Sequence, residues 1–316
     1  MDTAEIMSIF LPHLLEAGAG VMGGKRLVHY TSAEAAFRII TGKQVWLRNA
    51  NLMNDYSEMR HGLTCLQNAW VSPAGVKLQG WLDSKSDGLK DEVLSTFDSH
   101  SDNLRNATFL MSLSEHDDDE DLYGRLSMWR AYGGREGVAL VLNPMMFLSE
   151  SDEMGVYSAP VVYRDIGEFV KWFEGWVDNI IAAESRIQIL DRATLAATMF
   201  YAFRTFVLAT KHPGFREEKE WRVFHSPYLD AATKWASFDV EVVNGTPQHL
   251  VKVNLFDDES VGVIGVAPAS LINRVIIGPC ESPLPIRNAI GYALDRAEVP
   301  DYASKIWMSF IPLRQR

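Results

Sequence analysis

The sequence predicts an α+β fold with a mixed or antiparallel sheet at its core. Apolar runs of strand length outnumber those that a βαβ repeat would supply. They cluster late in the chain with short turns between them, which fits this core better than a doubly wound sheet. Residues 166–210 carry a dense aromatic and aliphatic stripe that indicates two long helices meeting near Asp191. We therefore expect one α+β domain over residues 1–316, with residues 166–210 as a helical insertion within it.

Local signals near the N-terminus predict the first helices and strands. Residues 4–16 have a helical apolar face, residues 18–24 form a glycine-rich hinge, and residues 27–30 are a short strand. Ser32 is a favourable N-cap for the helix that follows. Gly42 stands where that helix needs a C-terminal cap. These signals place one helix between the first strand and the next.

The remaining elements are predicted from short apolar runs and from one weakly patterned stretch. Residues 72–106 are polar and indicate no more than a helix near residues 92–97 between loops. A helix begins at Asn54 and runs toward Trp70. Further strands are expected at 45–47, 109–113, 138–142, 160–163, 220–225, 238–243, 250–255, 275–278 and 306–313, and an amphipathic segment at 286–296.

The net charge of the chain limits the kinds of molecule that it is expected to bind. The chain holds 30 lysines and arginines against 41 aspartates and glutamates, so its formal net charge is −11. This balance argues against a general electrostatic hold on nucleic acid or anionic lipid. A local basic groove would reverse that expectation, and its candidate residues are Lys25, Arg26, Arg38, Lys43 and Arg48.

The cysteines and the N-terminal segment indicate a cytoplasmic protein. Cys65 and Cys280 are far apart and no C-x-x-C is present, so we interpret both as buried thiols in a reducing compartment. The first residues are acidic, whereas a signal peptide opens with basic residues. No run approaches the roughly 18 apolar residues of a transmembrane helix. We expect no membrane contact and no bound metal.

Two stretches match ligand-binding motifs only superficially. Residues 18–23 spell G-x-G-x-x-G, but a predicted helix precedes them and a strand follows, which reverses the dinucleotide-binding order. The acidic run 115–121 offers oxygen ligands for Ca²⁺ or Mg²⁺, yet it lacks the alternation and the glycine of an EF-hand loop. We interpret this run as a solvated loop, with a metal or partner role as the alternative.

Two polar motifs lie at predicted helix starts. His29-Tyr30-Thr31 puts an imidazole just before a helix N-terminus, where it can hydrogen-bond a ligand hydroxyl beside a partly positive helix end. A structural histidine that ties a turn together is the alternative. Asn54-Asp55-x-x-Glu58 is also a candidate, although helix capping explains it without a ligand.

A third motif is aromatic and rich in glycine. Met128-Trp129-Arg130-Ala131-Tyr132-Gly133-Gly134 precedes the apolar strand at Val138 and suits a flat ring held by stacking. Core aromatics followed by an ordinary turn are the alternative.

The fourth motif, within residues 211–222, is the most informative. Strand alternation places Glu218, Glu220 and Arg222 on one face. These charges are costly there unless they are paired or face a solvated cleft. Cross-strand ion pairs on an edge strand explain them structurally. A cleft in which a glutamate acts as a general base or stabilises charge is the functional interpretation.

Together these motifs resemble a bacterial family known mainly as a domain of unknown function. The resemblance covers about residues 27–280 and by itself implies no biochemistry. The matching pattern is His29-Tyr30-Thr31, Asn54-Asp55-x-x-Glu58, Met128-Trp129-x-x-Tyr132-Gly133, Val161-Val162-Tyr163, Glu218-x-Glu220-Trp221-Arg222 and Ile276-Ile277-Gly278-Pro279.

The opening motif, with its short helix to Gly42, also resembles ADP-ribosyltransferases of the His-Tyr-Glu kind. This resemblance implies an ADP-ribosyltransferase-like fold in which His29 holds a ribose hydroxyl of NAD and Tyr132 stacks on nicotinamide. It implies that Glu220 steadies the ribosyl cation, with Glu218 as a second catalytic carboxylate on the same face. The spacing between the second and third motifs is longer here because of the helical insertion. The expected NAD-binding residues are His29, Tyr30, Thr31, Asn54, Tyr132 and Arg222.

The resemblance therefore predicts an NAD-dependent ADP-ribosyltransferase, a glycosyltransferase that takes NAD as substrate and cleaves the nicotinamide–ribose bond. A cytoplasmic bacterial toxin or an antiviral defence component, with a cognate antitoxin or regulatory partner, fits that activity. The acceptor stays open between protein, nucleic acid and a small molecule. Two alternatives remain: a non-catalytic module that binds a nucleotide or a partner, and a metal-assisted hydrolase or nuclease that uses Asp55, Glu58, Glu218 and the acidic run.

Overall fold

The computed structural model describes residues 3–52, 58–148, 151–243 and 245–312. Contacts divide the chain into two compact units. The first unit contains Met1–Ala17, Asn49–Thr108 and Ala159–Arg216. The second contains Gly18–Arg48, Phe109–Ser158 and Glu217–Arg316. The predicted insertion at 166–210 thus lies in the first unit, together with two earlier segments of the chain.

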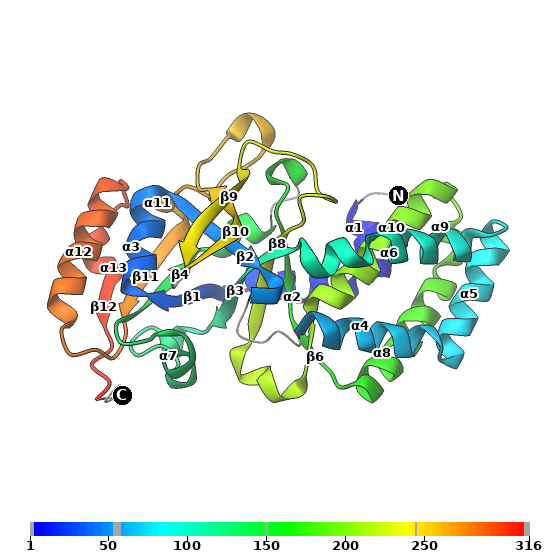
Figure 1. Ribbon diagram of the computed structural model, residues 1–316, viewed down its shortest axis with the longest axis horizontal. Helices are drawn as coiled ribbons and strands as arrows, with labels where there is room; N and C mark the ends of the chain where they lie inside the picture. Colours follow the sequence, from blue (N-terminus) through cyan, green and yellow to red (C-terminus); the bar gives the residue numbers. More distant parts are fainter. Residues whose placement is uncertain (1–2, 53–57, 149–150, 244, 313–316) are drawn as a thin grey trace. The chain divides into compact units, whose positions relative to one another are not determined.

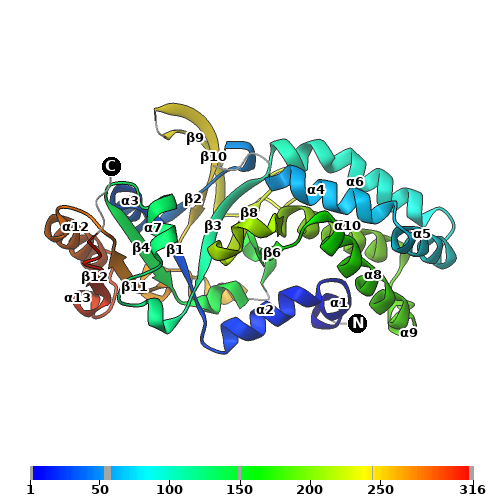
Figure 2. The same ribbon diagram turned by 90° about the horizontal axis from the view of Figure 1, so that it is seen from below.

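Helices dominate the first unit, and α4, α6, α8 and α10 run side by side in both views (Figures 1 and 2). Its two short strands, β6 (Val162–Tyr163) and β7 (Thr210–Lys211), pair in parallel. The helices are α1 (Thr3–Phe10), the start of α2 (Pro12–Met22), α4 (Glu58–Trp70), α5 (Pro73–Lys85), α6 (Leu89–Asn106), α8 (Ile166–Ala182), α9 (Glu184–Ile187) and α10 (Arg192–Ala209).

Aromatic side chains form the core of this helical unit. Phe169 and Trp176 of α8 pack against Phe206 of α10 with ring centroids 6.2 and 5.1 Å away. The indole N–H of Trp176 donates to the carbonyl oxygen of Phe10 at 2.9 Å, which anchors α1. Asp191 caps α10, so the predicted start of the second long helix is confirmed, whereas the first long helix, α8, already ends at Ala182 and α9 lies between the two. The aromatic stripe read in the sequence is therefore a packing surface.

The second unit is built on one open sheet. Its strands are β1 (Arg26–Ser32), β2 (Gln44–Asn49), β3 (Phe109–His116), β4 (Gly137–Leu142), β5 (Tyr157–Pro160), β8 (Glu220–His225), β9 (Ala236–Val243), β10 (Thr246–Asn254), β11 (Ile272–Ile277) and β12 (Ile306–Met308). Its helices are α3 (Ala33–Gly42), α7 (Leu126–Tyr132), α11 (Pro268–Leu271), α12 (Pro283–Arg296) and α13 (Tyr302–Lys305).

The strand order confirms a mixed, mostly antiparallel sheet within an α+β fold. The main path is β12-β11-β4-β1-β3-β2-β10-β9, and β8 pairs with β3. Strands β11 and β12 are parallel, whereas the pairs β11–β4, β4–β1, β1–β3 and β3–β8 are antiparallel. Because sequential strands seldom lie together here, most pairings join segments far apart in the chain.

Two sequence predictions about helices were wrong. The hinge expected at 18–24 is helical as far as Met22, because α2 restarts at Pro12 and continues through Gly18 and Gly20. The polar stretch 72–106 forms α5 and α6, which bury Leu78, Leu82, Val93 and Phe97. Tertiary packing of a few apolar residues stabilises helices whose overall composition is polar.

Gly62 of α4 is required by the close approach of α10. A Cβ atom at this position would overlap the carbonyl oxygen of Val207, which is fixed within α10. We expect Gly62→Ala to lower the free energy of unfolding by at least about 2 kcal/mol, because the two helices must separate. Gly80→Ala is the matched control, since a Cβ at Gly80 in α5 meets nothing within 4 Å. Urea denaturation measures both variants, and equal stabilities would contradict this packing argument.

His13 of α2 makes the stability of the first unit depend on pH. Burial and, second, the charge of Arg164 lower the pKa of its imidazole from 6.5 to about 4. The unfolded chain therefore binds more protons between these two values, so stability present above pH 6.5 is lost as the pH falls toward 4. This residue should account for about 2 kcal/mol of lost stability between pH 7 and pH 5. Urea denaturation of His13→Leu at both pH values should show a flatter dependence; an unchanged dependence would refute this assignment.

Candidate functional site

Strand register assigns the candidate side chains of the second unit to two faces of its sheet. Ser114 of β3 pairs with Val28 of β1 on one edge and with Glu220 of β8 on the other, so these three side chains share a face. Tyr30 shares that face because side chains alternate along β1. His29 points to the opposite face for the same reason. The predicted imidazole and Glu220 thus lie on opposite faces of one sheet.

His29 lies where the sheet divides. Strand β8 pairs with β3 along residues 109–114, so β1 and β2 share the other edge of β3 and separate there. The Nδ1 atom of His29 lies 3.1 Å from the carbonyl oxygen of Ser112 in β3. A carbonyl only accepts hydrogen bonds, so Nδ1 carries the proton and donates. The imidazole N–H thus takes the place of a backbone N–H, which a neighbouring strand would supply to the Ser112 carbonyl if the two strands did not separate.

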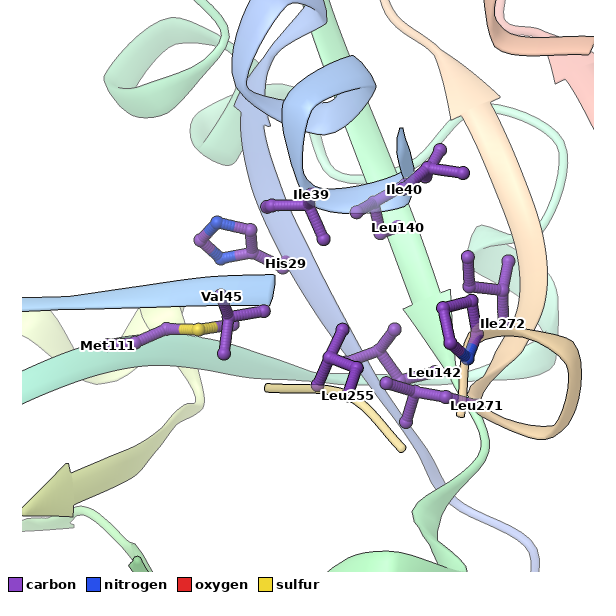
Figure 3. A pocket seen from close by; sticks show the side chains of 11 residues that line it. His29, Ile39, Ile40, Val45, Met111, Leu140, Leu142, Leu255, Leu271 and Ile272 are labelled. Carbon is purple, nitrogen blue, oxygen red and sulfur yellow. The ribbon is translucent and has the colours of Figure 1, made fainter. Parts of the chain in front are cut away.

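The environment of His29 keeps its ring neutral. Burial lowers the pKa of the imidazole by more than the hydrogen bond to Ser112 raises it. Figure 3 shows the ring between Ile39 of α3 and Val45 of β2, with Met111 of β3 nearby. The cavity here has a volume of about 20 Å³, which is room for about one water molecule. A dinucleotide would therefore need this region to open.

The guanidinium of Arg125, just before α7, joins three segments around Tyr30. Nη1 donates to Ser114 Oγ at 2.8 Å and to the carbonyl oxygen of Glu217 at 2.9 Å. Nε and Nη2 bind the carboxylate of Glu120 at 2.9 and 3.1 Å. The backbone N–H of Arg125 donates to the Tyr30 hydroxyl at 2.8 Å, and burial raises the pKa of that hydroxyl to about 12. These bonds attach the backbone at Glu217, just before β8, to β3 and to α7.

The interpretation of the acidic run 115–121 as a solvated loop holds for Asp118 and Asp119, which are exposed, but not for the rest of the run, which is half-buried or buried. Five of its carboxylates pair with basic side chains, and all of these partners except Arg125 come from distant positions that cannot be read from the run itself. The pairs are Glu115 with Lys25 at 2.9 Å, Asp117 with Lys219 at 2.8 Å, Asp118 with Arg26 at 2.6 Å, Glu120 with Arg125 at 2.9 Å, and Asp121 with Arg26 at 3.0 Å and Arg274 at 3.5 Å. The run therefore positions Arg125, which in turn holds the site.

Glu220 is buried and its charge is compensated. Arg222 binds it through Nε to Oε1 at 2.9 Å and Nη2 to Oε2 at 3.2 Å, and Ser112 Oγ donates to Oε1 at 2.6 Å. Glu220 is 5% exposed and Arg222 is 0% exposed. The ion pair that we expected across strands lies within β8 instead. Removing one partner would leave an unpaired charge in the core.

Glu218 and Tyr132 form a half-buried pair on the same face as Glu220. The Tyr132 hydroxyl donates to Glu218 Oε1 at 2.9 Å. Tyr132 packs against the cluster that includes Tyr30, which places the pair on that face. Strand alternation does not explain this position, because Glu218 ends a 3₁₀ turn, Pro213–Glu218, and Lys219 has a φ of 43°. The 3₁₀ turn therefore places the Glu218 carboxylate on the face that strand alternation had predicted.

Trp129 fixes α7 against the Tyr30 face. Its ring meets the Tyr30 ring edge-on with centroids 4.8 Å apart, and its indole N–H donates to the Tyr123 carbonyl oxygen at 2.7 Å. A Cβ at Gly278 would lie 2.7 Å from the Trp129 ring, so this glycine leaves room for the indole. The third motif therefore supplies two core residues, Met128 and Trp129, and one aromatic residue of the candidate site, Tyr132.

The other predicted site residues do not join this group. Thr31 is half-buried on the His29 face, opposite Val138 of β4. Asn54 and Asp55 lie outside the described residues, and α4 begins at Glu58. Over the described ranges, no cluster of three His, Cys, Asp or Glu side chains could hold a metal ion. In the same ranges, no helix is long and apolar enough to cross a bilayer.

Three contributors to the site were missed in the sequence. Ser112 and Ser114 occupy alternate positions in the otherwise apolar start of β3, and this spacing was a usable signal for one polar face. Arg125 offered no comparable signal. Its hydrogen bond to the Glu217 carbonyl joins residues 92 positions apart, and only the folded chain brings them together.

Comparison with known families supports part of the predicted resemblance. Residues 128–223 match the model of a family described as protein of unknown function (DUF2971). This confirms the resemblance to a domain-of-unknown-function family over the stretch that contains the third and fourth motifs. The first two motifs and Ile276–Pro279 lie outside the matched stretch. Neither a curated protein nor a solved structure matches the chain.

Arg125 should contribute more to stability than an exposed arginine of the same helix region. Arg125→Lys keeps the charge but loses the planar fork that reaches Ser114, Glu120 and the Glu217 carbonyl together. We expect a loss of about 2–3 kcal/mol in the free energy of unfolding. Arg130→Lys, at an exposed position of α7, is the control and should change it by less than about 0.5 kcal/mol. Chemical denaturation checks both, and similar values for the two variants would contradict the assignment.

Proposed function

We propose that this protein is an NAD-dependent ADP-ribosyltransferase-like enzyme that cleaves the nicotinamide–ribose bond. The observation that carries the proposal is the 2.9 Å hydrogen bond between Tyr132 and Glu218. It joins the aromatic residue of the third motif to a carboxylate of the fourth, across 86 positions of sequence. Nicotinamide–ribose cleavage needs this combination, a flat ring for the base next to a negative charge for the ribose.

In this reaction the glycosidic C–N bond breaks and its electron pair leaves with nicotinamide. The ribose carbon gains oxocarbenium character, which a nearby carboxylate stabilises electrostatically. A nucleophile of the acceptor then bonds to that carbon and releases its proton to solvent water. Glu218 is the carboxylate that we assign to the cation, because it is only half-buried and the hydroxyl of Tyr132 donates to it.

Glu220 has a different role in this proposal. Its charge is compensated by Arg222 and Ser112, so it positions the start of β8 and thereby Glu218. In His29 the Nδ1 atom donates to Ser112, so Nε2 is free of a proton and can accept a hydrogen bond from a hydroxyl of the ligand. Ser112 contacts both residues, through its carbonyl and its hydroxyl, so a ligand reaching both must enter where β1 and β2 separate. This requirement makes opening of the 20 Å³ cavity part of the proposal.

The proposed activity also implies a type of fold and a role in the cell. The fold would be of the ADP-ribosyltransferase type, with the division between β1 and β2 as the NAD site. The protein would act in the cytoplasm as a toxin or a phage-defence component, with a cognate antitoxin or regulatory partner. Its acceptor would be a protein, a nucleic acid or a small molecule, and the net charge of −11 favours an acceptor other than duplex DNA.

A non-catalytic nucleotide-binding or partner-binding module is the second candidate. The buried Glu220–Arg222 pair favours it, because a compensated carboxylate is a weak stabiliser of a cation. Placement of His29 on the opposite face favours it as well. Binding of NAD without release of nicotinamide would support this candidate over the enzyme.

Incubation of the purified full chain with NAD labelled in the nicotinamide ring tests the enzyme. We expect release of labelled nicotinamide, and a loss of roughly 10²–10³-fold in rate for Glu218→Gln, because one preorganised charge is removed. Tyr132→Phe should lower the rate too, since the hydroxyl no longer orients the carboxylate. Chromatography of the reaction mixture measures the release.

The controls separate loss of chemistry from loss of folding. Glu217→Gln changes the exposed carboxyl next to Glu218 and should leave the rate unchanged. Glu220→Gln should lower both rate and stability, so its rate is interpreted only beside its circular dichroism melting curve. If Glu218→Gln and Glu217→Gln release nicotinamide at the same rate, the assignment of Glu218 is wrong. If the parent protein releases none with or without protein and nucleic-acid acceptors, the proposed activity is wrong.

A further inference from the structure

A second hollow of the second unit lies where the C-terminal ends of α3 and α12 meet. These helices pack on one another. The hollow has a volume of about 280 Å³, near the lower end of the range for small-ligand sites. Its walls are formed by Ile40, Thr41, Lys43, Tyr292, Arg296 and Ala297. Only Ile40 is shared with the cavity beside His29, so this hollow is a separate site.

Two cations converge on this hollow without acidic partners. Over the described residues, no carboxylate is paired with Lys43 or Arg296. Other basic residues of the predicted groove are engaged, since Lys25 binds Glu115 and Arg38 binds Glu34. In a chain with a net charge of −11, two unpaired cations at one concave point attract an anion. Arginine in particular suits phosphate oxygens, which its planar fork can bind in pairs.

The rest of the lining suits a flat ring. Tyr292 is 61% exposed, so one face of its ring is open to a ligand at little desolvation cost. Ile40 and Ala297 are buried and supply an apolar floor. The combination of an exposed aromatic, an apolar floor and two cations matches a compound that carries both a ring and a phosphate.

We propose that this hollow binds a nucleoside monophosphate, with its phosphate on Lys43 and Arg296 and its base against Tyr292. The competing explanation is that both cations only compensate the negative C-terminal ends of α3 and α12. That explanation accounts for the charges but not for a hollow of this volume beside an exposed ring. The two explanations differ in whether AMP binds and in which side chains its affinity depends on.

Calorimetric titration of the full chain with AMP at low ionic strength tests the site. We expect binding, with adenosine at least about tenfold weaker because it lacks the phosphate. Arg296→Gln and Lys43→Asn should each weaken AMP by about tenfold. Asparagine is chosen because Lys43 has a φ of 49°, which asparagine tolerates. Tyr292→Ala should weaken AMP but leave the affinity for inorganic phosphate unchanged.

Matched variants locate the binding. Arg287→Gln removes the same charge nine positions earlier on α12, on the opposite side of the helix, and should leave AMP affinity unchanged. Glu218→Gln should also leave it unchanged, which separates this site from the proposed NAD site. Absence of AMP binding, or equal affinity in the parent, Arg296→Gln and Lys43→Asn, would overturn the proposal in favour of charge compensation. Equal AMP affinity in Tyr292→Ala and the parent would overturn the assignment of the ring.

Discussion

The guanidinium of Arg125 is the contact on which the candidate site depends. It binds β3 through Ser114, the approach to β8 through the Glu217 carbonyl, and the acidic run through Glu120. Its backbone N–H also holds the Tyr30 hydroxyl. Loss of the guanidinium would remove a hydrogen-bond donor from Ser114, from Glu120 and from the Glu217 carbonyl at once. The same guanidinium thus fixes the backbone that carries Glu218.

The sheet adds a second constraint, which is the division between β1 and β2. Strand β3 has β8 along one edge, so β1 and β2 must share the other and separate. Ser112 lies at that division and bonds to His29 through its carbonyl and to Glu220 through its hydroxyl. A sheet that divides leaves backbone groups without ladder partners, and polar side chains are the means by which a protein satisfies them. His29 and Glu220 are therefore candidate functional residues and, at the same time, residues that stabilise the divided sheet.

The strongest sequence predictions were those that depend on local pattern. Apolar runs located β1, β3, β4 and β8, and Ser32 caps α3 as expected. The polar stretch 72–106 was misjudged because helix formation there depends on burial of a few residues against other helices. The burial of part of the acidic run was missed for a related reason, since basic partners such as Lys219 and Arg274 lie far away in sequence. Local signals carry no information about either kind of partner.

The sequence by itself determined the α+β class, the position of most strands and some of the polar residues that gather in the second unit, among them Glu218, Glu220 and Arg222. Alternation along a strand is a local property, so it correctly put Glu220 and Arg222 on one face. Only the tertiary structure decided that His29 faces away from Glu220, that Tyr132 meets Glu218, and that Arg125 binds the Glu217 carbonyl beside Glu218. The reason is that relative facing depends on the register between strands, and register is set by contacts between residues roughly a hundred positions apart.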